Sequence, residues 1–368
     1  MSQNSKMKQD FWAYLTPELM IDIFSRLPIR SIIRCKCVCK SWLELLETCE
    51  FVNSHLSKSA TGLAIFQSFI FGGPSPSKPY KFLEFVENSM PVVFNMSFPH
   101  EHQQIHSSVN GLLFLFDPNI RPRDYFICNP ITRDYIKLPR PREYPLKCNV
   151  QLDTFGFGVS KKSGQYKVVG LSYTNETKCE VYTLGTGLWR SIEPNIPLRY
   201  DCDYSHAATF LNGNLHWRGR ALRDDSVWIS CFDLETERFT IFSVPPIHGL
   251  YPALSALEGC LVFCDNSYED DERKEIVIWF MNKYGDDKSW TKKFIITKSW
   301  YHFIGDLCPI KVFEDGDILI AEDCRSRVLC YSSKTQTIEA TDLAEFCGFD
   351  HISVVSYTPS FVPLNTFC

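Results

Sequence analysis

The chain has 368 residues, enough for two or three ordinary domains or for one small module and one large β structure. Hydrophobic residues make up 45% and charged residues 22%, as in ordinary globular proteins. A formal net charge of −5 gives no reason to expect a nucleic-acid partner, and no apolar run reaches the roughly eighteen residues of a membrane span. Residues 1–10 are polar, are predicted to be disordered and lack the apolar centre of a secretion signal. We therefore expect the protein in the cytosol, the nucleus or both.

Short helices are predicted over 11–57. Thr16 is a good N-cap residue, and Pro17 follows at a position where a helix tolerates a missing N–H. Apolar residues then recur at helical spacing until Pro28, which ends the helix at Leu27 or just before. A second apolar series follows directly. The pattern predicts two or three short helices, which persist only through tertiary contacts.

Ten residues of this module match a known sequence pattern. The pattern reads Leu-Pro, then Glu-Leu, a run of aliphatic residues, Leu-Pro, and finally Val-Cys-Lys-x-Trp. The matching residues are Leu15, Glu18, Leu19, Ile23, Leu27, Pro28, Val38, Cys39, Lys40 and Trp42. The module resembles the F-box, which binds the adaptor of cullin-RING ubiquitin ligases. Thr16 departs from the pattern, because many members carry the first proline there.

The resemblance implies that the module docks on a Skp-type adaptor and, through it, on a cullin. The candidate adaptor-binding residues are Leu15, Pro17, Leu19, Ile23, Leu27, Pro28, Ile32, Val38, Cys39 and Trp42. Some of them must form the module's own core, and we expect the indole of Trp42 to be buried. A unit this small cannot hide all its apolar side chains, so another protein is expected to cover the excess. The alternative is that the helices merely cap a larger domain.

The sixteen cysteines are expected to be buried thiols, because free cysteines in a reducing compartment behave as small hydrophobic residues. The closest group is Cys35, Cys37 and Cys39. A spacing of two sends neighbours to nearly opposite sides of a helix, so these thiols would not converge on a metal ion. No metal or cofactor is expected.

From about residue 61 onward, short runs rich in Val, Ile, Phe, Tyr and Trp alternate with turn residues, which is typical of β-strands. Dipeptides that suit tight hairpin turns precede apolar strands at Asn110-Gly111, Asn212-Gly213, Glu258-Gly259 and Asp315-Gly316. Between the first two of them, Phe155-Gly156-Phe157-Gly158 is interpreted as the missing turn. The series repeats at intervals of roughly fifty residues.

A second series of turns runs in step with the first. It comprises 129–133, 184–187, 233–237, 282–290 and 332–335. A unit of roughly fifty residues with three or four strands is the size of a β-propeller blade. We expect five such units between 107 and 345, and a sixth from 61–98 that is closed by the C-terminal run Ile352 to Tyr357. An irregular two-sheet sandwich is the alternative.

The β region, 61–361, carries motifs of its own. They are Ser108-Val109-Asn110-Gly111-Leu112-Leu113, Asn129-Pro130-Ile131-Thr132 and Phe155-Gly156-Phe157-Gly158. Together with the helical module, they make the chain similar to plant F-box proteins with an F-box-associated, kelch-like domain, a wide group that includes the pollen S-locus F-box proteins. Val109 stands where the family usually has Cys. The expected fold class is α+β multidomain: a small all-α module, then an all-β propeller-like domain of about six blades.

The resemblance implies a substrate-recognition subunit of a Skp–cullin–F-box (SCF) ubiquitin ligase, which binds an unknown protein target through the β domain for ubiquitination and proteasomal degradation. Candidate target-binding loops are 72–79, 140–145, 221–227 and 266–275. The alternatives are a propeller-type glycan-binding protein or enzyme with a helical cap, and an F-box protein that acts without ubiquitination.

Catalysis is not expected. The sequence has no nucleophile elbow, phosphate-binding loop, dinucleotide-binding glycine pattern or zinc-protease helix. The one histidine cluster consists of His100, His102 and His106, for which a polar loop is a better interpretation than a metal site.

Overall fold

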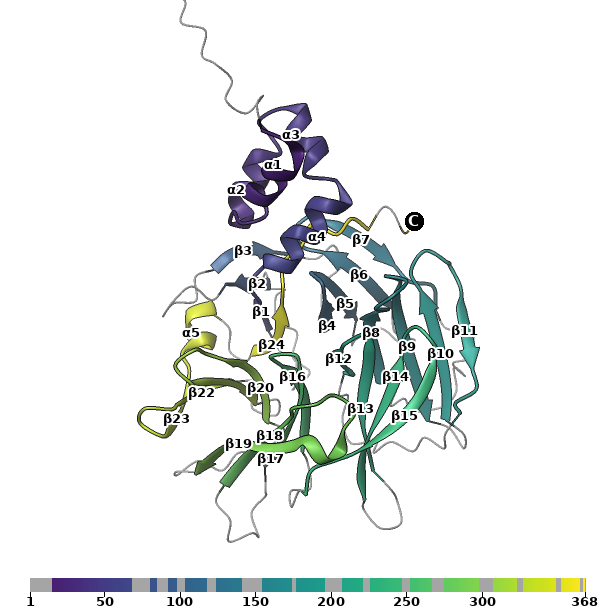
Figure 1. Cartoon of the computed structure of the whole chain (residues 1–368), viewed down its shortest axis with the longest axis vertical. Coiled ribbons are helices and arrows are strands. Elements are labelled where there is room, and N and C mark those ends of the chain that lie inside the picture. Colours follow the sequence, from purple (N-terminus) through teal and green to yellow (C-terminus); the bar gives the residue numbers. More distant parts are fainter. Residues whose placement is uncertain are drawn as a thin grey trace, which may run out of the picture.

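The structure is a computed structural model. It describes residues 15–67, 80–84, 92–97, 103–117, 124–140, 154–173, 177–195, 207–220, 226–246, 252–266, 275–297, 307–322, 327–348, 352–364 and 367. A group of helices, purple in Figure 1, lies at one end of a ring of six four-stranded sheets. The predicted fold class is therefore confirmed. The predicted disorder of 1–10 falls outside the described residues.

Four helices occupy the described part of the N-terminal module, more than the sequence pattern predicted. They are α1 (Pro17–Phe24), α2 (Ile29–Cys35), α3 (Lys40–Leu45) and α4 (Cys49–Lys58). Thr16 caps α1 as predicted, because its hydroxyl accepts the Leu19 N–H at 3.5 Å. Thr48 accepts the Phe51 N–H at 3.2 Å and so starts α4 as a separate helix. α1 ends at Phe24, earlier than predicted.

The ring consists of six blades, each an antiparallel sheet of four strands. Blade 1 comprises β24 (Ile352–Tyr357), β1 (Gly62–Gln67), β2 (Tyr80–Leu83) and β3 (Val92–Met96). Blade 2 comprises β4 (Gln104–Val109), β5 (Leu112–Phe116), β6 (Tyr125–Asn129) and β7 (Asp134–Lys137). Blade 3 comprises β8 (Thr154–Val159), β9 (Tyr166–Tyr173), β10 (Thr177–Thr183) and β11 (Trp189–Ile192).

The other half of the ring repeats this plan. Blade 4 comprises β12 (Thr209–Leu211), β13 (Asn214–Arg220), β14 (Val227–Asp233) and β15 (Arg238–Ser243). Blade 5 comprises β16 (Ala253–Leu257), β17 (Cys260–Asn266), β18 (Glu275–Met281), a short 3₁₀ helix (Asp287–Ser289) and β19 (Trp290–Thr297). Blade 6 comprises β20 (Leu307–Val312), β21 (Ile318–Glu322), β22 (Arg327–Ser332) and β23 (Thr337–Ala340), and α5 (Leu343–Cys347) follows it.

The first strands of the blades surround the ring axis, since β4 contacts both β24 and β8, and β16 contacts β20. In blade 1 this place is taken by β24, the last strand of the chain. β24 pairs along its whole length with β1, from Gly62 opposite Tyr357 to Gln67 opposite Ile352. The pairing removes the free edges of an open ring. The six-bladed propeller and its closure by the C-terminal run are confirmed, and the two-sheet sandwich is excluded.

Tight turns join the first and second strands of blades 2, 4 and 5, as predicted. Asn110 and Gly111 have φ angles of 51° and 79°, and Glu258 and Gly259 have φ angles of 52° and 75°. Two successive positive φ angles are those of a type I′ hairpin turn, for which glycine suits the second position. The pair at 212–213 has the same geometry.

The predicted turn at 155–158 is wrong, because these residues lie inside strand β8. The turn of blade 3 instead lies at 160–165, where Gly164 has a φ of +67°. Gly156 serves close packing: a Cβ atom there would lie 2.8 Å from the side chain of Leu215 in blade 4. The glycine allows two neighbouring sheets to approach each other.

The second predicted series of turns is confirmed in place. Its members join the third and fourth strands of blades 2 to 6, between β6 and β7, β10 and β11, β14 and β15, β18 and β19, and β22 and β23. The two series therefore lie at the same face of the ring, because strands alternate in direction within each antiparallel blade.

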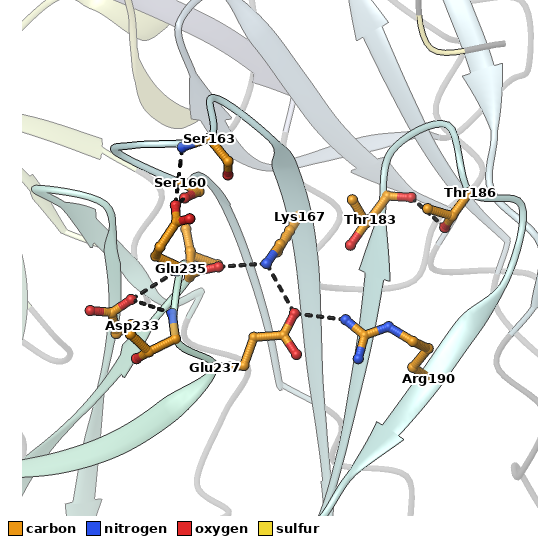
Figure 2. Close-up of polar contacts among 11 residues, drawn as sticks. Ser160, Ser163, Lys167, Thr183, Thr186, Arg190, Asp233, Glu235 and Glu237 are labelled. Carbon is orange, nitrogen blue, oxygen red and sulfur yellow. Dashed lines mark hydrogen bonds and ion pairs between the residues drawn. The ribbon is translucent and has the colours of Figure 1, made fainter.

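An ion-pair network centred on the buried Lys167 joins blades 3 and 4 (Figure 2). Lys167 donates to Glu237 Oε1 at 2.9 Å and to the Leu234 carbonyl at 2.6 Å, and Arg190 reaches the same carboxylate oxygen at 2.7 Å. Burial acts to raise the pKa of Glu237, but the hydrogen bonds from Arg190 and Lys167 outweigh it and lower that pKa. Separate sheets share no backbone ladder, so side-chain contacts of this kind hold neighbouring blades together.

Phe82 tests the closure of the ring. Its ring is 1% exposed and lies 4.9 Å from that of Tyr357 on β24 and 4.3 Å from that of Phe94. Phe82→Ala is expected to lower the free energy of unfolding by about 3–5 kcal/mol, measured by urea titration. Phe346→Ala on α5, where the side chain is 56% exposed, is the control and should change it by no more than about 0.5 kcal/mol. Equal effects of the two variants would contradict this role of Phe82.

Candidate functional site

The helical module has a core that continues into the ring. Its buried members in the helices are Met20, Phe24, Ile29, Ile32, Leu46, Phe51 and Val52. The same cluster includes Val109, Leu112 and Phe114 of blade 2. The module therefore rests on the ring beside blades 1 and 2, with α4 next to the sheets (Figure 1).

Helices α1 to α3 lie beyond α4 as seen from the ring (Figure 1), and this part of the module exposes apolar side chains. Leu19 is 54%, Ile23 38% and Val38 62% exposed. Of the nine large apolar side chains that are exposed within the described residues, five belong to this module. We call the whole set the exposed helical face: Pro17, Leu19, Ile23, Pro28, Ile33, Val38, Cys39 and Leu43. Such a concentration is typical of contact surfaces.

The structure divides the ten predicted adaptor-binding residues into three groups. The exposed ones are Pro17, Leu19, Ile23, Pro28, Val38 and Cys39. The half-buried ones, which pack against the core, are Leu15, Leu27 and Trp42. Ile32 is fully buried, so its assignment to the contact surface is corrected: it belongs to the module's own core.

Trp42 is half-buried, contrary to the expectation of a buried indole. Its ring meets that of Phe24 edge to face, with centroids 4.8 Å apart. The indole packs against the core but remains partly accessible, and α3 has no fully buried residue.

Two exposed apolar residues, Ile33 (43%) and Leu43 (37%), are missing from the predicted set. Ile33 directly follows the apolar Ile32, and Leu43 directly follows the apolar Trp42. Consecutive helical residues lie about 100° apart around the axis, so the two members of such a pair face different surroundings. The signal was present in these adjacent pairs, but only the packed structure shows which member faces solvent.

The expectation of buried thiols holds for part of the chain. Cys128, Cys231 and Cys264 in the blades are buried, and burial raises the pKa of the Cys128 thiol well above its usual value. In the helical module the expectation is wrong, because Cys37 and Cys39 are exposed. Cys49, at the start of α4, is exposed as well.

Polar contacts fix α1 against α4. Asp22 accepts hydrogen bonds from Arg26 at 3.0 Å and from Lys58 at 2.7 Å. Lys58 also donates to the Ser25 hydroxyl at 2.7 Å. The bonds from Arg26 and Lys58 lower the pKa of the Asp22 carboxyl to about 2. These contacts add to the apolar core that joins α1 and α4, and they leave the exposed helical face uncovered.

The described residues contain no group of three His, Cys, Asp or Glu side chains that could hold a metal ion. His106 of the predicted histidine cluster is half-buried and packs edge-on against Phe114, with ring centroids 5.3 Å apart. His100 and His102 lie outside the described residues. In the part of the chain that is described, no helix has both the length and the hydropathy to span a bilayer.

The four predicted target-binding loops lie, except for a few flanking residues, outside the described residues. They are 72–79, 140–145, 221–227 and 266–275.

Two families match the chain. The F-box domain matches residues 12–54, and the F-box associated beta propeller domain matches residues 58–359. These ranges correspond to the helical module and to the ring. The chain therefore belongs to the F-box proteins that carry an F-box associated β-propeller domain.

Similar curated proteins come from Arabidopsis thaliana. F-box protein At1g47340 is 28% identical, over 90% of this chain and 76% of its own length. F-box protein DOR is 30% identical, over 62% of this chain and 60% of its own length. A further F-box protein, At1g46840, is 32% identical over 62% of this chain, and the match spans about half, 49%, of its own length.

Ile32 and Val38 separate the core of the module from its surface. Ile32→Ala is expected to lower the free energy of unfolding of the module by about 2–5 kcal/mol, because the side chain is fully buried. Val38→Ala should change it by no more than about 0.5 kcal/mol, because that side chain is 62% exposed. Urea titration followed by tryptophan fluorescence measures both. A large loss of stability in Val38→Ala would contradict its placement on the surface.

His55 makes the stability dependent on pH. It lies on α4 and is 3% exposed, and burial lowers its pKa to about 4 from an ordinary 6.5. Between these two values the unfolded chain binds a proton that the folded chain excludes, so stability falls as the pH is lowered through this window. The expected loss is about 1–3 kcal/mol.

The variant that tests this prediction is His55→Phe, which keeps an aromatic ring and removes the titrating imidazole. It should flatten the dependence of the urea midpoint on pH between 6.5 and 4. Part of the slope should remain, because burial also lowers the pKa of His216 to about 4. A slope identical to that of the parent would show that His55 does not contribute.

Proposed function

We propose that this protein is the substrate-recognition subunit of an SCF ubiquitin ligase. The observation that carries the proposal is the exposed helical face, a set of apolar side chains left uncovered in a module whose other side is packed on the ring. A Skp-type adaptor covers this face and joins the protein to a cullin. The match of residues 12–54 to the F-box domain supports the assignment.

Covering this face is energetically favourable. Complete burial of a large aliphatic side chain is worth about 1.5–3 kcal/mol, and Leu19, Ile23 and Val38 are each more than a third exposed. The helices are also short, so contacts on their open side stabilise them further through linkage between binding and folding. Binding of the adaptor therefore stabilises the helices of the module.

The ring holds a protein target, and the protein makes and breaks no bonds itself. Its physical contribution is proximity: two binding surfaces on one body raise the local concentration of target lysines near the ubiquitin-charged enzyme. The complex acts in the cytosol, the nucleus or both. Its target is a protein that remains to be identified.

Leu19→Asp tests adaptor binding. A carboxylate in the covered interface loses its hydration, so the affinity for a purified Skp-type adaptor should fall by at least about tenfold, which corresponds to 1.4 kcal/mol. Leu188→Asp is a matched control, because Leu188 is 56% exposed and Leu19 54%, and it lies on blade 3. Calorimetry on the two full-length variants measures the effect. Undiminished binding by Leu19→Asp, or equal losses in both, would refute the adaptor surface.

Depletion of the protein in plant cells tests the ligase role. Proteins that this subunit marks for degradation should accumulate, and the parent protein, but not Leu19→Asp, should restore their normal levels. Quantitative proteomics with and without a proteasome inhibitor measures this. If the adaptor binds but no protein accumulates, the protein is an F-box protein that acts without ubiquitination.

A further inference from the structure

The segment after β24, residues 358–364, crosses blade 2 toward blade 3 (yellow in Figure 1). It lies on the face of the ring that carries the two series of turns. We call it the C-terminal strap. Asn129, whose side chain is fully buried, donates from Nδ2 to the carbonyls of Ser360 at 3.1 Å and Val362 at 2.8 Å. The Leu364 N–H donates to Asp134 Oδ2 at 3.3 Å. Hydrogen bonds to the main chain give the strap one defined path over the ring.

The strap fits tightly against the first turn of blade 2. The Ser360 hydroxyl donates to the Asn110 carbonyl. A Cβ atom on Gly111 would lie 2.3 Å from Ser360 Oγ and 2.6 Å from Ser360 N, closer than non-bonded atoms approach. The strap therefore occupies the space where any other residue at 111 would carry its side chain.

The strap also touches the helices. Phe361 is 4% exposed, and its ring centroid lies 5.8 Å from that of Phe51 and 5.1 Å from that of His55, both on α4. Lys36 Nζ, directly after α2, lies 5.2 Å from the centre of the same ring. One aromatic side chain of the strap thus contacts two separate parts of the helical module.

We propose that the C-terminal strap is a second anchor that locks the helical module on the ring and fixes the direction of the exposed helical face. The first anchor is the connection between α4 and β1, residues 59–61. The strap starts beside it, since the hydroxyl of Thr358 pairs with that of Thr61 at 2.8 Å. A short connection alone still permits the module to rotate relative to the ring. A second contact at a distance from the connection prevents this rotation. The consequence for a ligase rests on the proposed function: the spacing between adaptor and target is set by the strap.

The chain offers a matched pair of variants for the test. Gly111 and Gly259 hold the same place in the first turns of blades 2 and 5, with φ angles of 79° and 75°. Alanine strains both turns to the same degree, but a Cβ atom on Gly259 meets nothing within 4 Å. The difference between Gly111→Ala and Gly259→Ala therefore isolates the contact with the strap.

Amide hydrogen exchange of α4 and the rate of tryptic cleavage after Lys58 measure the attachment in the full-length protein. Gly111→Ala should raise both by at least about tenfold over the parent, while Gly259→Ala leaves both within about twofold. Exchange in blade 5 should not rise in Gly111→Ala, which separates detachment of the module from global unfolding. Identical behaviour of α4 in the two variants would overturn the proposal.

Phe361→Ala provides an independent decision, including the case in which Gly111→Ala does not fold. It removes the contacts with α4 and leaves both turns intact, so it should raise the same two rates; Phe346→Ala on α5 should not. Unchanged rates in Phe361→Ala would overturn the proposal. Affinity for the purified adaptor is measured separately in the parent protein. If the parent itself fails to bind the adaptor, the proposed function fails while the exchange result still decides the role of the strap.

Discussion

The pairing of β24 with β1 is the interaction on which the rest of the structure depends. Six residue pairs join the two ends of the β domain, and without them blade 1 lacks its inner strand and the ring has free edges. The pairing also brings the C-terminal end of β24 beside the N-terminal end of β1, where the helices enter, because the two strands are antiparallel. The strap therefore starts close to α4. Ring closure and attachment of the helices share one geometric cause.

Side-chain contacts connect neighbouring blades, since each blade is a separate sheet. Glycine inside β8 allows close approach at Gly156, while Lys167 and Glu237 supply a buried polar connection between the same two blades. Gly156 and Lys167 thus place a small and a charged residue inside strands, where a pattern of strands alone favours large apolar ones. Packing between neighbouring blades thus explains residues that look irregular in the sequence of a single blade.

The helical module is covered on one side only. Its core merges with that of blade 2 through residues such as Phe51 and Leu112, whereas Leu19 and Val38 remain exposed. The ring therefore supplies part of the apolar contact that a module of this size lacks. The part left uncovered is the surface that we propose for the adaptor, and the proposed role of the strap is to keep this surface in a constant position.

Local chemistry was enough to predict the class of each part. Caps such as Thr16, glycines that follow Asn110 and Glu258, and the repeat interval of the turns depend on a few neighbouring residues, so they can be read from the chain alone. Contacts between distant segments cannot be read in this way. The turn-like Phe155-Gly156-Phe157-Gly158 became a strand because blade 4 packs against it. Ile32 is buried and Ile33 is exposed, because burial depends on what surrounds a helix. The close contact between Ser360 and Gly111 joins residues that only the closed ring brings together.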